Sequence, residues 1–307
     1  MNQFIRTLAF ISIALLSFPV SAENGTRVLM LGTGTPVPDS DRAGASVAVI
    51  SQGKVFVFDA GGGMVQNAIA AREKLGIIEL GVKPLDPIGI CCLFFTHLHS
   101  DHTLDYVELA NTLWWHRDAK LRAWGPIGLK SMTEGMYQLM AADIRIRTSG
   151  LQPVKHPDYY KVDVTEIDDG VVYEQDGVRI EAFSVPHGDI KPAFGYKITT
   201  PDKSIVISGD TSYSEKLLEM SKGVDLLIHE VISDKGLSTR SEFWQKYHKE
   251  AHTPTTLLAK LASKALPKKL VIYHALFYGT SEQELLEEIR SHYDGEVVIA
   301  NDLDIFY

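Results

Sequence analysis

The sequence is poor in cysteine: only Cys91 and Cys92 occur among its 307 residues. They are adjacent in the apolar run IGICCLFF, and neighbouring side chains of a strand point to opposite faces, so they pair only with strain. Although exported proteins often contain disulfides, we therefore expect two buried free thiols. The fold must then be held by its core, and 45% hydrophobic residues suffice for one large domain or two smaller ones.

Long runs of lysine or arginine, internal repeats and low-complexity linkers are also missing. With 22% charged residues and 13 prolines, the chain is typical of a globular protein and not of a disordered or fibrous one. Its formal net charge is −9 at pH 7, and an acidic protein repels polyanions unless it carries a local basic patch. We therefore expect no nucleic acid as a bulk partner.

Residues 1–22 have the pattern of a secretory signal peptide. A basic start, Met1–Arg6, precedes the apolar run Thr7–Leu16, and small residues ending at Ala22 predict cleavage there. The alternative is an N-terminal membrane anchor, but the apolar run is short for a membrane span and polar residues follow it at once. We expect a secreted or periplasmic protein without a stable membrane anchor, with one domain over 23–307.

Apolar, β-branched runs alternate with helical patterns along the mature chain. A hairpin is expected at 171–185 with its turn at Asp176-Gly177, and Ser281 with Glu284 forms a capping-box pattern. Strand runs followed by helices, twice over, suggest two sheets packed face to face with helices outside. The further expected strands are 27–34, 45–63, 88–95, 193–198, 204–210, 225–231, 269–275, 296–300 and 303–307, and the expected helices are 64–76, 104–115, 254–265 and 281–293.

A cluster of histidines follows the apolar strand 88–95. His97 and His99 are two positions apart and share a face on an extended segment, so they can bind one metal ion. Asp101 and His102 follow where the chain turns, and their offset suits a second metal ion. Imidazole and carboxylate are ligands for zinc, manganese or iron.

One cluster cannot complete two metal sites, so further ligands must come from other strand ends. His187, Asp210 and His274 each follow an apolar strand, where side chains project into a cleft. Taken alone, a histidine at a strand end is more often a hydrogen-bonded structural residue, but the first cluster favours a ligand role.

The run THLHSDH at 96–102 resembles the HxHxDH signature of the metallo-β-lactamase superfamily. Further segments resemble the branch of that superfamily that contains ribonuclease Z and certain arylsulfatases, and the resemblance covers nearly the whole mature chain. These segments are LGTGTP at 31–36, FDAGGG at 58–63, RAWGPIGLK at 122–130, ISGDTSYSEKL at 207–217, LLIHE at 226–230, HTPTTLLAKLA at 252–262 and YHALFYG at 273–279.

The resemblance implies an α/β fold, the four-layer αββα sandwich, with a site for two divalent metal ions. Zinc is the first expectation, and manganese or iron are alternatives. The first metal ion would be held by His97, His99 and His187. The second would be held by Asp101, His102 and His274. The carboxylate of Asp210 would bridge the two ions.

The resemblance also implies catalytic roles for Asp101, His252 and Glu230. In that branch a histidine at the place of His252 assists proton transfer and a glutamate at the place of Glu230 orients it, although Glu230 can equally be a structural acid. Two cations lower the pKa of a bridging water to about 7, and the hydroxide attacks phosphorus, sulfur or a carbonyl carbon. Asp101 or His252 can then pass a proton to the leaving oxygen.

One departure from the branch narrows the expected function. Ribonuclease Z proteins usually carry a long basic arm before the bridging-aspartate motif, whereas here only TTPDK at 199–203 joins the two strands. The missing arm argues against tRNA processing. True β-lactamases generally lack an aspartate that bridges the metals, so Asp210 favours ester hydrolysis.

Aromatic residues near the motifs could bind substrate. Trp114 and Trp115 follow the histidine cluster and could stack on an aryl group, although helical aromatics are more often part of a core. The segment 233–251 could be a lid that carries Trp244, or a surface excursion.

The sequence therefore predicts an exported dinuclear-metal hydrolase that cleaves a small sulfate ester or phosphodiester, with a small-molecule ester as its partner. Lactonase or β-lactamase activity at the same site is one alternative, and a non-catalytic metal- or ligand-binding protein is another. The oligomeric state is not determined by the sequence, and a homodimer is compatible with it.

Overall fold

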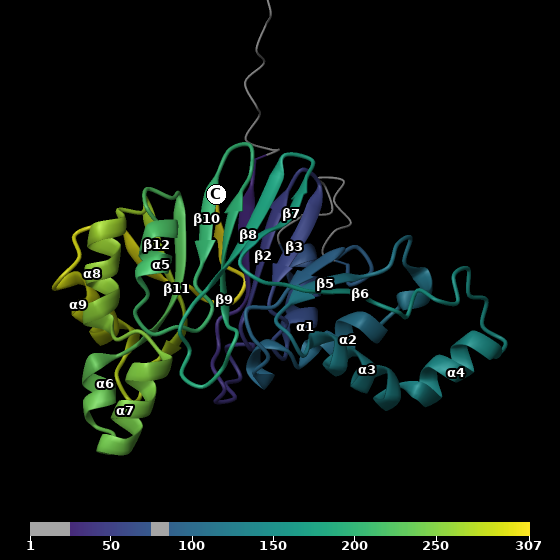
Figure 1. The fold of residues 1–307 in the computed structure, drawn as a ribbon, viewed down its shortest axis with the longest axis horizontal. Coiled ribbons are helices and arrows are strands. Elements are labelled where there is room, and N and C mark those ends of the chain that lie inside the picture. The colour runs from purple at the N-terminus through teal and green to yellow at the C-terminus, as the bar shows by residue number, and fades with distance from the viewer. Residues whose placement is uncertain (1–24, 75–85) are drawn as a thin grey trace, which may run out of the picture.

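The computed structural model describes residues 25–74 and 86–307. In these residues two seven-stranded sheets lie face to face, and helices cover their outer sides (Figure 1). This confirms the predicted αββα sandwich. The predicted signal peptide at 1–22 and the predicted end of the first helix at Gly76 lie outside the described residues.

The first sheet contains the N-terminal strands and the last strand of the chain. Its order is β14-β1-β2-β3-β4-β5-β6. Its strands are β1 (Arg27–Gly32), β2 (Ser46–Ser51), β3 (Lys54–Phe58), β4 (Cys92–Phe94), β5 (Arg122–Gly125), β6 (Asp163–Glu166) and β14 (Ile305–Phe306). The helices that follow them are α1 (Met64–Lys74), η2 (Ser100–His102), α2 (Asp105–Asn111), η3 (Trp114–His116), α3 (Leu129–Leu139) and α4 (Ala141–Ser149).

The second sheet is formed by the C-terminal half, in the order β13-β12-β11-β10-β9-β8-β7. Its strands are β7 (Gly170–Gln175), β8 (Val178–Ser184), β9 (Phe194–Thr199), β10 (Ser204–Ile207), β11 (Leu226–Ile232), β12 (Lys269–Leu276) and β13 (Val297–Ile299). Its helices are α5 (Glu215–Met220), α6 (Asp234–Ser238), α7 (Glu242–Ala251), α8 (Thr255–Ala265) and α9 (Glu282–Arg290).

An aromatic core joins the inner faces of the two sheets. Phe94 of β4 stacks on Trp124 of β5 with ring centroids 4.7 Å apart, and Phe58 of β3 contacts Tyr196 of β9 across the interface at 5.3 Å. Burying a phenylalanine contributes roughly 1.5–3 kcal/mol relative to leaving it exposed. This packing fixes the distance between the sheets, and the polar residues that follow these strands are placed with it.

Two local predictions are confirmed. The hairpin of β7 and β8 turns at Asp176 and Gly177, whose φ angles of 51° and 78° match the left-handed conformation that a tight two-residue turn requires. Helix α9 begins with a capping box in which the Ser281 side chain accepts from the Glu284 backbone and Glu284 accepts from Ser281.

Other segments differ from prediction. The expected helix at 104–115 is interrupted, because Leu113 has a φ of 54° and α2 ends at Asn111 before the short helix η3. Helices α3 and α4 were not predicted. They form an extension beyond the first sheet (Figure 1).

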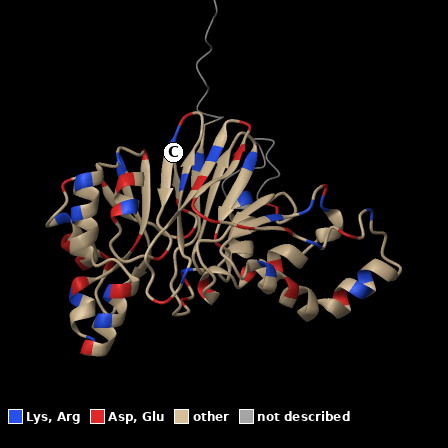
Figure 2. Cartoon of the chain, in the orientation of Figure 1, with Lys and Arg blue, Asp and Glu red and all other residues tan. Residues whose placement is uncertain are grey.

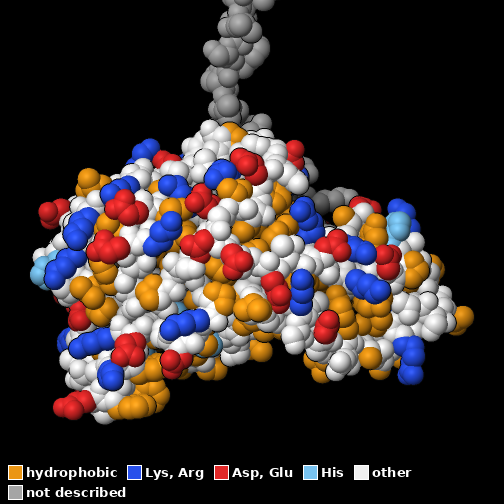
Figure 3. Space-filling view, in the orientation of Figure 1, with side chains coloured by type: hydrophobic (Ala, Val, Ile, Leu, Met, Phe, Trp, Pro, Cys, Tyr) orange, Lys and Arg blue, Asp and Glu red, His pale blue; other side chains and the backbone are white. Residues whose placement is uncertain are grey.

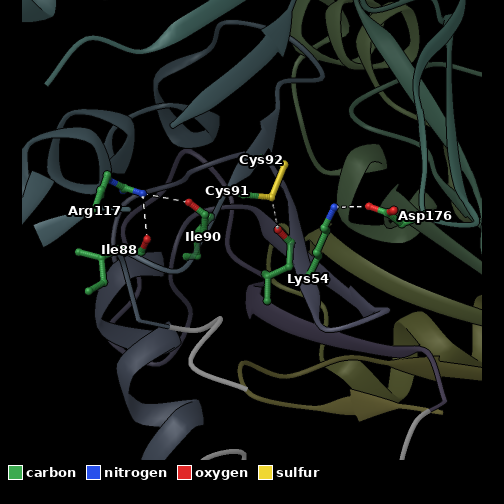
Figure 4. Close-up of a disulfide and its surroundings, with 8 residues drawn as sticks. Lys54, Ile88, Ile90, Cys91, Cys92, Arg117 and Asp176 are labelled. Carbon is green, nitrogen blue, oxygen red and sulfur yellow. Dashed lines mark hydrogen bonds and ion pairs between the residues drawn. A yellow bond between two sulfur atoms is a disulfide. The ribbon is translucent and has the colours of Figure 1, made fainter. Parts of the chain in front are cut away.

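The expectation of two free thiols is wrong: Cys91 and Cys92 form a disulfide (Figure 4). The physical reason lies in where the strand starts. Strand β4 begins at Cys92, and Cys91 precedes it, so the alternation of side chains along a strand does not govern this pair. Cys92 is buried and Cys91 is half-buried. The Sγ atom of Cys91 lies 3.7 Å from the Val55 carbonyl oxygen.

A buried arginine anchors the segment that enters β4. The Arg117 guanidinium donates to the carbonyl oxygens of Ile90 at 3.0 Å and Leu109 at 2.9 Å, and more weakly to Ile88 (Figure 4). Burial lowers the pKa of Arg117 to about 10, and the guanidinium is still charged at neutral pH. These bonds tie α2 to the strand that carries the histidine cluster.

Charges of both signs are spread over the described surface. Lysine, arginine, aspartate and glutamate lie mainly on the outer helices and the strand ends (Figure 2), and they alternate over the face in Figure 3. Within 25–74 and 86–307, no helix has the length and apolarity needed to cross a membrane.

We predict that Ser281→Ala lowers the free energy of unfolding by about 1 kcal/mol, because the first turn of α9 loses its cap. Urea denaturation at pH 7 measures this. The variant Ser291→Ala, at the other end of α9, is the matched control, and an unchanged denaturation midpoint for Ser281→Ala would contradict the prediction.

The carboxylate of Glu284 should make stability depend on pH. Hydrogen bonds from Lys235 and from Ser281 lower the pKa of Glu284 from 4.5 to about 2. A carboxyl group with a lowered pKa in the folded state stabilises above its unfolded pKa, and this contribution disappears as pH falls from about 4.5 to 2. The stability difference between the wild type and Glu284→Gln should therefore shrink over that range, measured by urea denaturation in a pH series.

Candidate metal centre

The seven predicted ligands converge at the ends of strands from both sheets. His97 and His99 follow β4, Asp101 and His102 lie in η2, and the remaining three come from the second sheet: His187 after β8, Asp210 after β10 and His274 within β12. All seven are buried except His99, which is half-buried. The two sheets thus bring together side chains up to 177 positions apart in the sequence.

The first predicted set forms a tight group of three imidazoles. The Nδ1 atom of His99 lies 3.0 Å from Nε2 of His97 and 3.3 Å from Nε2 of His187. Their ligand atoms lie within 4.8 Å of one another. Three ring nitrogens facing one centre are a typical arrangement for one divalent cation.

The second predicted set lies beside the first. The Oδ2 atom of Asp101 is 3.1 Å from Nε2 of His274 and 3.5 Å from Nε2 of His102. Asp210 lies between the two sets, because its carboxylate oxygens are 3.4 Å from His102, 3.5 Å from His274 and 3.9 Å from His187. This position is the one that a bridging carboxylate requires.

Hydrogen bonds behind the cluster fix the orientation of three rings. The Nδ1 atoms of His97, His102 and His187 lie 3.0, 2.8 and 2.7 Å from partners in the surrounding structure. The partners are Thr96 Oγ1, Asp59 Oδ2 and the Ala251 carbonyl oxygen. With Nδ1 engaged, each of these rings presents Nε2 to the centre, as metal-binding histidines do.

The backbone is strained at two residues of the site. Asp59 has a φ of 62° and His274 a φ of 47°, a left-handed conformation that is uncommon for residues other than glycine. Such conformations persist at functional sites, where the surrounding structure stabilises them. Gly61 is needed for a steric reason, since a Cβ atom there would lie 2.3 Å from the Asp101 carbonyl oxygen.

Burial keeps the first set of histidines neutral. Burial, followed by neighbouring histidine charges, lowers the pKa of His97 well below its usual value, and burial also lowers the pKa of His99 and of His187. A histidine must be unprotonated to bind a metal. These three residues are therefore ready to bind a metal at neutral pH.

The carboxylates shift the pKa of the second set in the other direction. Burial alone would lower the pKa of His102 and of His274, but Asp210 together with other carboxylates outweighs it and raises both. Burial alone would raise the pKa of Asp210, yet His274 and His102 hold it well below its usual value. The carboxylates thus favour positive charge at this position, which a bound cation can supply once the two rings have lost their protons.

The donor set fits divalent cations. Nε2 of His102 and Oδ1 of Asp210 are buried and lie 3.4 Å apart, and neither makes a well-aligned hydrogen bond among the described residues. Leaving such groups unpaired costs roughly 1–3 kcal/mol each, or more when they are charged. Five imidazoles and two carboxylates suit a metal of the zinc, manganese or iron type, and cations between them would satisfy both unpaired atoms.

His252 and Glu230 form a pair next to this cluster. His252 Nδ1 lies 3.2 Å from Glu230 Oε2, and Glu230 Oε1 accepts from the Thr253 backbone at 2.7 Å. Burial lowers the pKa of His252 to about 4. Burial, and then the charge of Asp210, raise the pKa of Glu230 well above its usual value.

The three predicted substrate-binding tryptophans have different surroundings. Trp114 is fully buried, with its ring against Trp115 and Tyr160, and offers no exposed face to a ligand. Trp115 lines a cavity of about 570 Å³ with Leu104. Leu104 also lines a second cavity of about 620 Å³ that reaches Asp101, and Trp115 does not line that cavity. Trp244 lies on α7 and is half exposed.

Sequence reasoning missed residues that act behind the ligands. Asp59 accepts from Thr96 N and Oγ1, both at 2.8 Å, as well as contacting His102. Its position at the end of a strand, before three glycines in FDAGGG, was the available signal. His248, whose Nε2 lies 2.8 Å from the Tyr278 hydroxyl, was also missed, and its place in the segment 233–251 gave no sign of this role.

Comparison with known proteins agrees with this geometry. The pattern of the Beta-lactamase superfamily domain matches residues 54–275. Ribonuclease Z of Mycobacterium avium is 31% identical over 283 residues, which cover 90% of this chain and 96% of that protein. The metallo-beta-lactamase fold protein YhfI from Bacillus subtilis has a TM-score of 0.69 at 17% identity, covering 92% of this chain and all of that one. Human tRNase Z, short form, has a TM-score of 0.63 at 20% identity, covering 92% and 98%.

The fold and the histidine–aspartate cluster define a metal-dependent hydrolase. The chain belongs to the metallo-β-lactamase superfamily and, within it, to the ribonuclease Z-like branch.

These relatives overturn the expectation of a small-molecule ester partner and no nucleic acid. Ribonuclease Z of Mycobacterium marinum and of Mycobacterium avium each match 90% of the chain, and a ribonuclease acts on RNA. The expectation rested on net charge and on the missing arm. Net charge is an average over the whole surface, and the short β9–β10 connection excludes only one way of holding RNA.

We predict that Asp59→Asn weakens metal binding about 10- to 100-fold, because an amide supports the His102 ring less well than a carboxylate. Competition with a chromophoric chelator measures the affinity. Asp225→Asn is the matched control, since Asp225 accepts from Ser204 at the opposite end of β11. Equal affinities for Asp59→Asn and the wild type would contradict the role of Asp59.

Proposed function

We propose that the protein is a phosphodiester hydrolase that cleaves RNA with two divalent cations. One observation carries the proposal: Asp210 lies within 4 Å of both groups of three ligands, and a histidine–glutamate pair lies beside them. Two cations a few ångströms apart suit an in-line displacement at phosphorus. The ribonuclease names of the relatives support RNA as the substrate class.

The proposed ligand sets are those described for the centre. His97, His99 and His187 would hold one cation, Asp101, His102 and His274 the other, and Asp210 would lie between them. Zinc is the first choice for these donors. When bound, the pair of cations supplies an activated water and neutralises charge on the phosphoryl oxygens.

His252 is the proposed proton donor to the leaving oxygen. Because burial is the largest cause that raises the pKa of Glu230, in the proposed mechanism this carboxyl group holds a proton, which it donates to Nδ1 of His252. The neutral imidazole then carries its own proton on Nε2. As Nε2 gives that proton to the leaving oxygen, Nδ1 can take the proton of Glu230, so no buried imidazolium has to persist.

Export is part of this proposal. The signal-peptide pattern of residues 1–22 supports it, and an exported enzyme of this type would degrade RNA outside the cytoplasm. Fractionation of cells and N-terminal sequencing of the product test it, with Glu23 as the expected first residue.

The substrate class is tested with purified, metal-loaded protein. A labelled single-stranded oligoribonucleotide and bis-p-nitrophenyl phosphate should be hydrolysed, and p-nitrophenyl sulfate and a β-lactam serve as comparison substrates. Chelation should abolish activity and zinc should restore it. Turnover of the sulfate or the lactam without turnover of either phosphodiester would overturn the proposal.

Asp210→Asn should lower kcat for the oligoribonucleotide by about two orders of magnitude or more, because the bridging carboxylate loses its charge. Elemental analysis of the purified variant should show less bound metal than in the wild type. Asp225→Asn, remote from the centre, is the control. A variant that retains full metal content and full activity would exclude Asp210 from the centre.

His252→Ala should slow cleavage about 10²- to 10⁴-fold for RNA, whose leaving alkoxide needs a proton. Bis-p-nitrophenyl phosphate has a good leaving group, so its hydrolysis should fall much less. Steady-state rates for both substrates give the comparison. If RNA and bis-p-nitrophenyl phosphate lose activity by the same factor, His252 is not the proton donor.

A further inference from the structure

Helix α7 exposes a cluster of aromatic side chains that the proposed mechanism does not use. Phe243, Trp244 and Tyr247 are 73%, 49% and 44% exposed. Trp244 lies edge-on to both of the others, with ring centroids 5.6 Å apart in each case. We call these three residues the α7 aromatic face. Large aromatic side chains that stay exposed together on one helix indicate a binding surface.

A row of stacked rings connects this face to the metal centre. Trp244 stacks on His248 with centroids 5.7 Å apart, and His248 packs on His252 at 5.6 Å. His252 in turn stacks on the proposed ligand His274 at 6.0 Å. The aromatic face thus lies at one end of a row of rings whose other end is the cluster, and His248 and His252 within that row are buried.

The row is held rigidly. The Tyr278 hydroxyl bonds to Nε2 of His248 at 2.8 Å, and the Arg240 guanidinium lies 4.5 Å over the Tyr278 ring. The last residue of α7, Ala251, uses its carbonyl oxygen to bind Nδ1 of His187 at 2.7 Å. Helix α7 is thus tied at its C-terminal end to a proposed metal ligand, so the aromatic face has a fixed position relative to the centre.

The charges around α7 nearly balance. Arg240, Lys246 and Lys249 are exposed next to or within the helix, and so are Glu242 and Glu250. The rest of the surface in Figure 3 mixes both signs, and the chain as a whole has a net charge of −9. Phosphate contacts alone therefore supply limited affinity, and base stacking on aromatic rings is the other main source of affinity for single strands.

We propose that the α7 aromatic face stacks the unpaired bases of single-stranded RNA and so positions the strand at the metal centre. This inference rests on the proposed function. It makes Trp244 and Tyr247 substrate-positioning residues and gives the enzyme a preference for single strands, because paired bases cannot reach an exposed ring. The sequence preference should be weak, since every base has a face that can stack.

Binding of RNA to the chain 23–307 tests this inference without catalysis. With metal removed by chelation, fluorescence anisotropy measures the affinity for a labelled 12-nucleotide single-stranded oligoribonucleotide and for its duplex. Trp244→Ala and Tyr247→Ala should each weaken single-strand binding by about five- to a hundredfold. Trp244→Phe should recover most of the loss, because it keeps a ring.

Tyr307→Ala is the matched control: it removes an exposed tyrosine, 74% exposed, at the far end of the chain, and should leave binding unchanged. Unchanged single-strand affinity for Trp244→Ala and Tyr247→Ala would overturn the inference, as would an equal loss for the duplex. The proposed function is judged separately by RNA cleavage in the wild type. Cleavage without an effect of Trp244→Ala refutes the aromatic face alone, and an effect on binding without cleavage refutes the catalytic proposal alone.

Discussion

The hydrogen bonds of the Asp59 carboxylate are the interaction on which the site depends. One carboxylate, at the end of β3, holds the Thr96 backbone and hydroxyl and the Nδ1 atom of His102. Thr96 in turn contacts Nδ1 of His97. Two ligand rings assigned to different cations therefore share one anchor. The left-handed backbone of Asp59 is the conformational cost of placing a carboxylate there, and the buried sheet around it offsets this cost.

Two buried acids of the site have pKa values shifted in opposite directions. Asp210 faces His102 and His274, and these neighbours keep its pKa low. Glu230 lies 3.2 Å from His252, yet burial and the charge of Asp210 raise its pKa. Like charges near one another cannot both persist in a buried site, so the environment separates the two pKa values. In the proposed function, Asp210 can therefore bind a cation, while Glu230 can donate a proton to His252.

Much of the fold and of the ligand cluster could be predicted because the signals are local. A strand followed by HxHxDH, and single histidines or aspartates directly after other strands, required only the rule that strand ends meet at one edge of a sheet. The hairpin at Asp176 and the capping box at Ser281 are likewise local. The disulfide of Cys91 and Cys92 was missed because it depends on the residue at which β4 begins, which a continuous apolar run does not define.

The remaining features depend on contacts between distant segments. The bond from Ala251 to His187 and the stacking of His252 on His274 arise only when the C-terminal end of α7 packs against β12 and the segment that follows β8. Trp114 and Trp244 are equally aromatic in sequence, yet one lies in the core and the other is half exposed. The same argument applies to RNA: formal charge sums all residues, whereas binding depends on the few groups beside the centre. In the proposed function, a chain with a net charge of −9 binds a polyanion through cations at the centre and through exposed rings that stack on single-stranded bases.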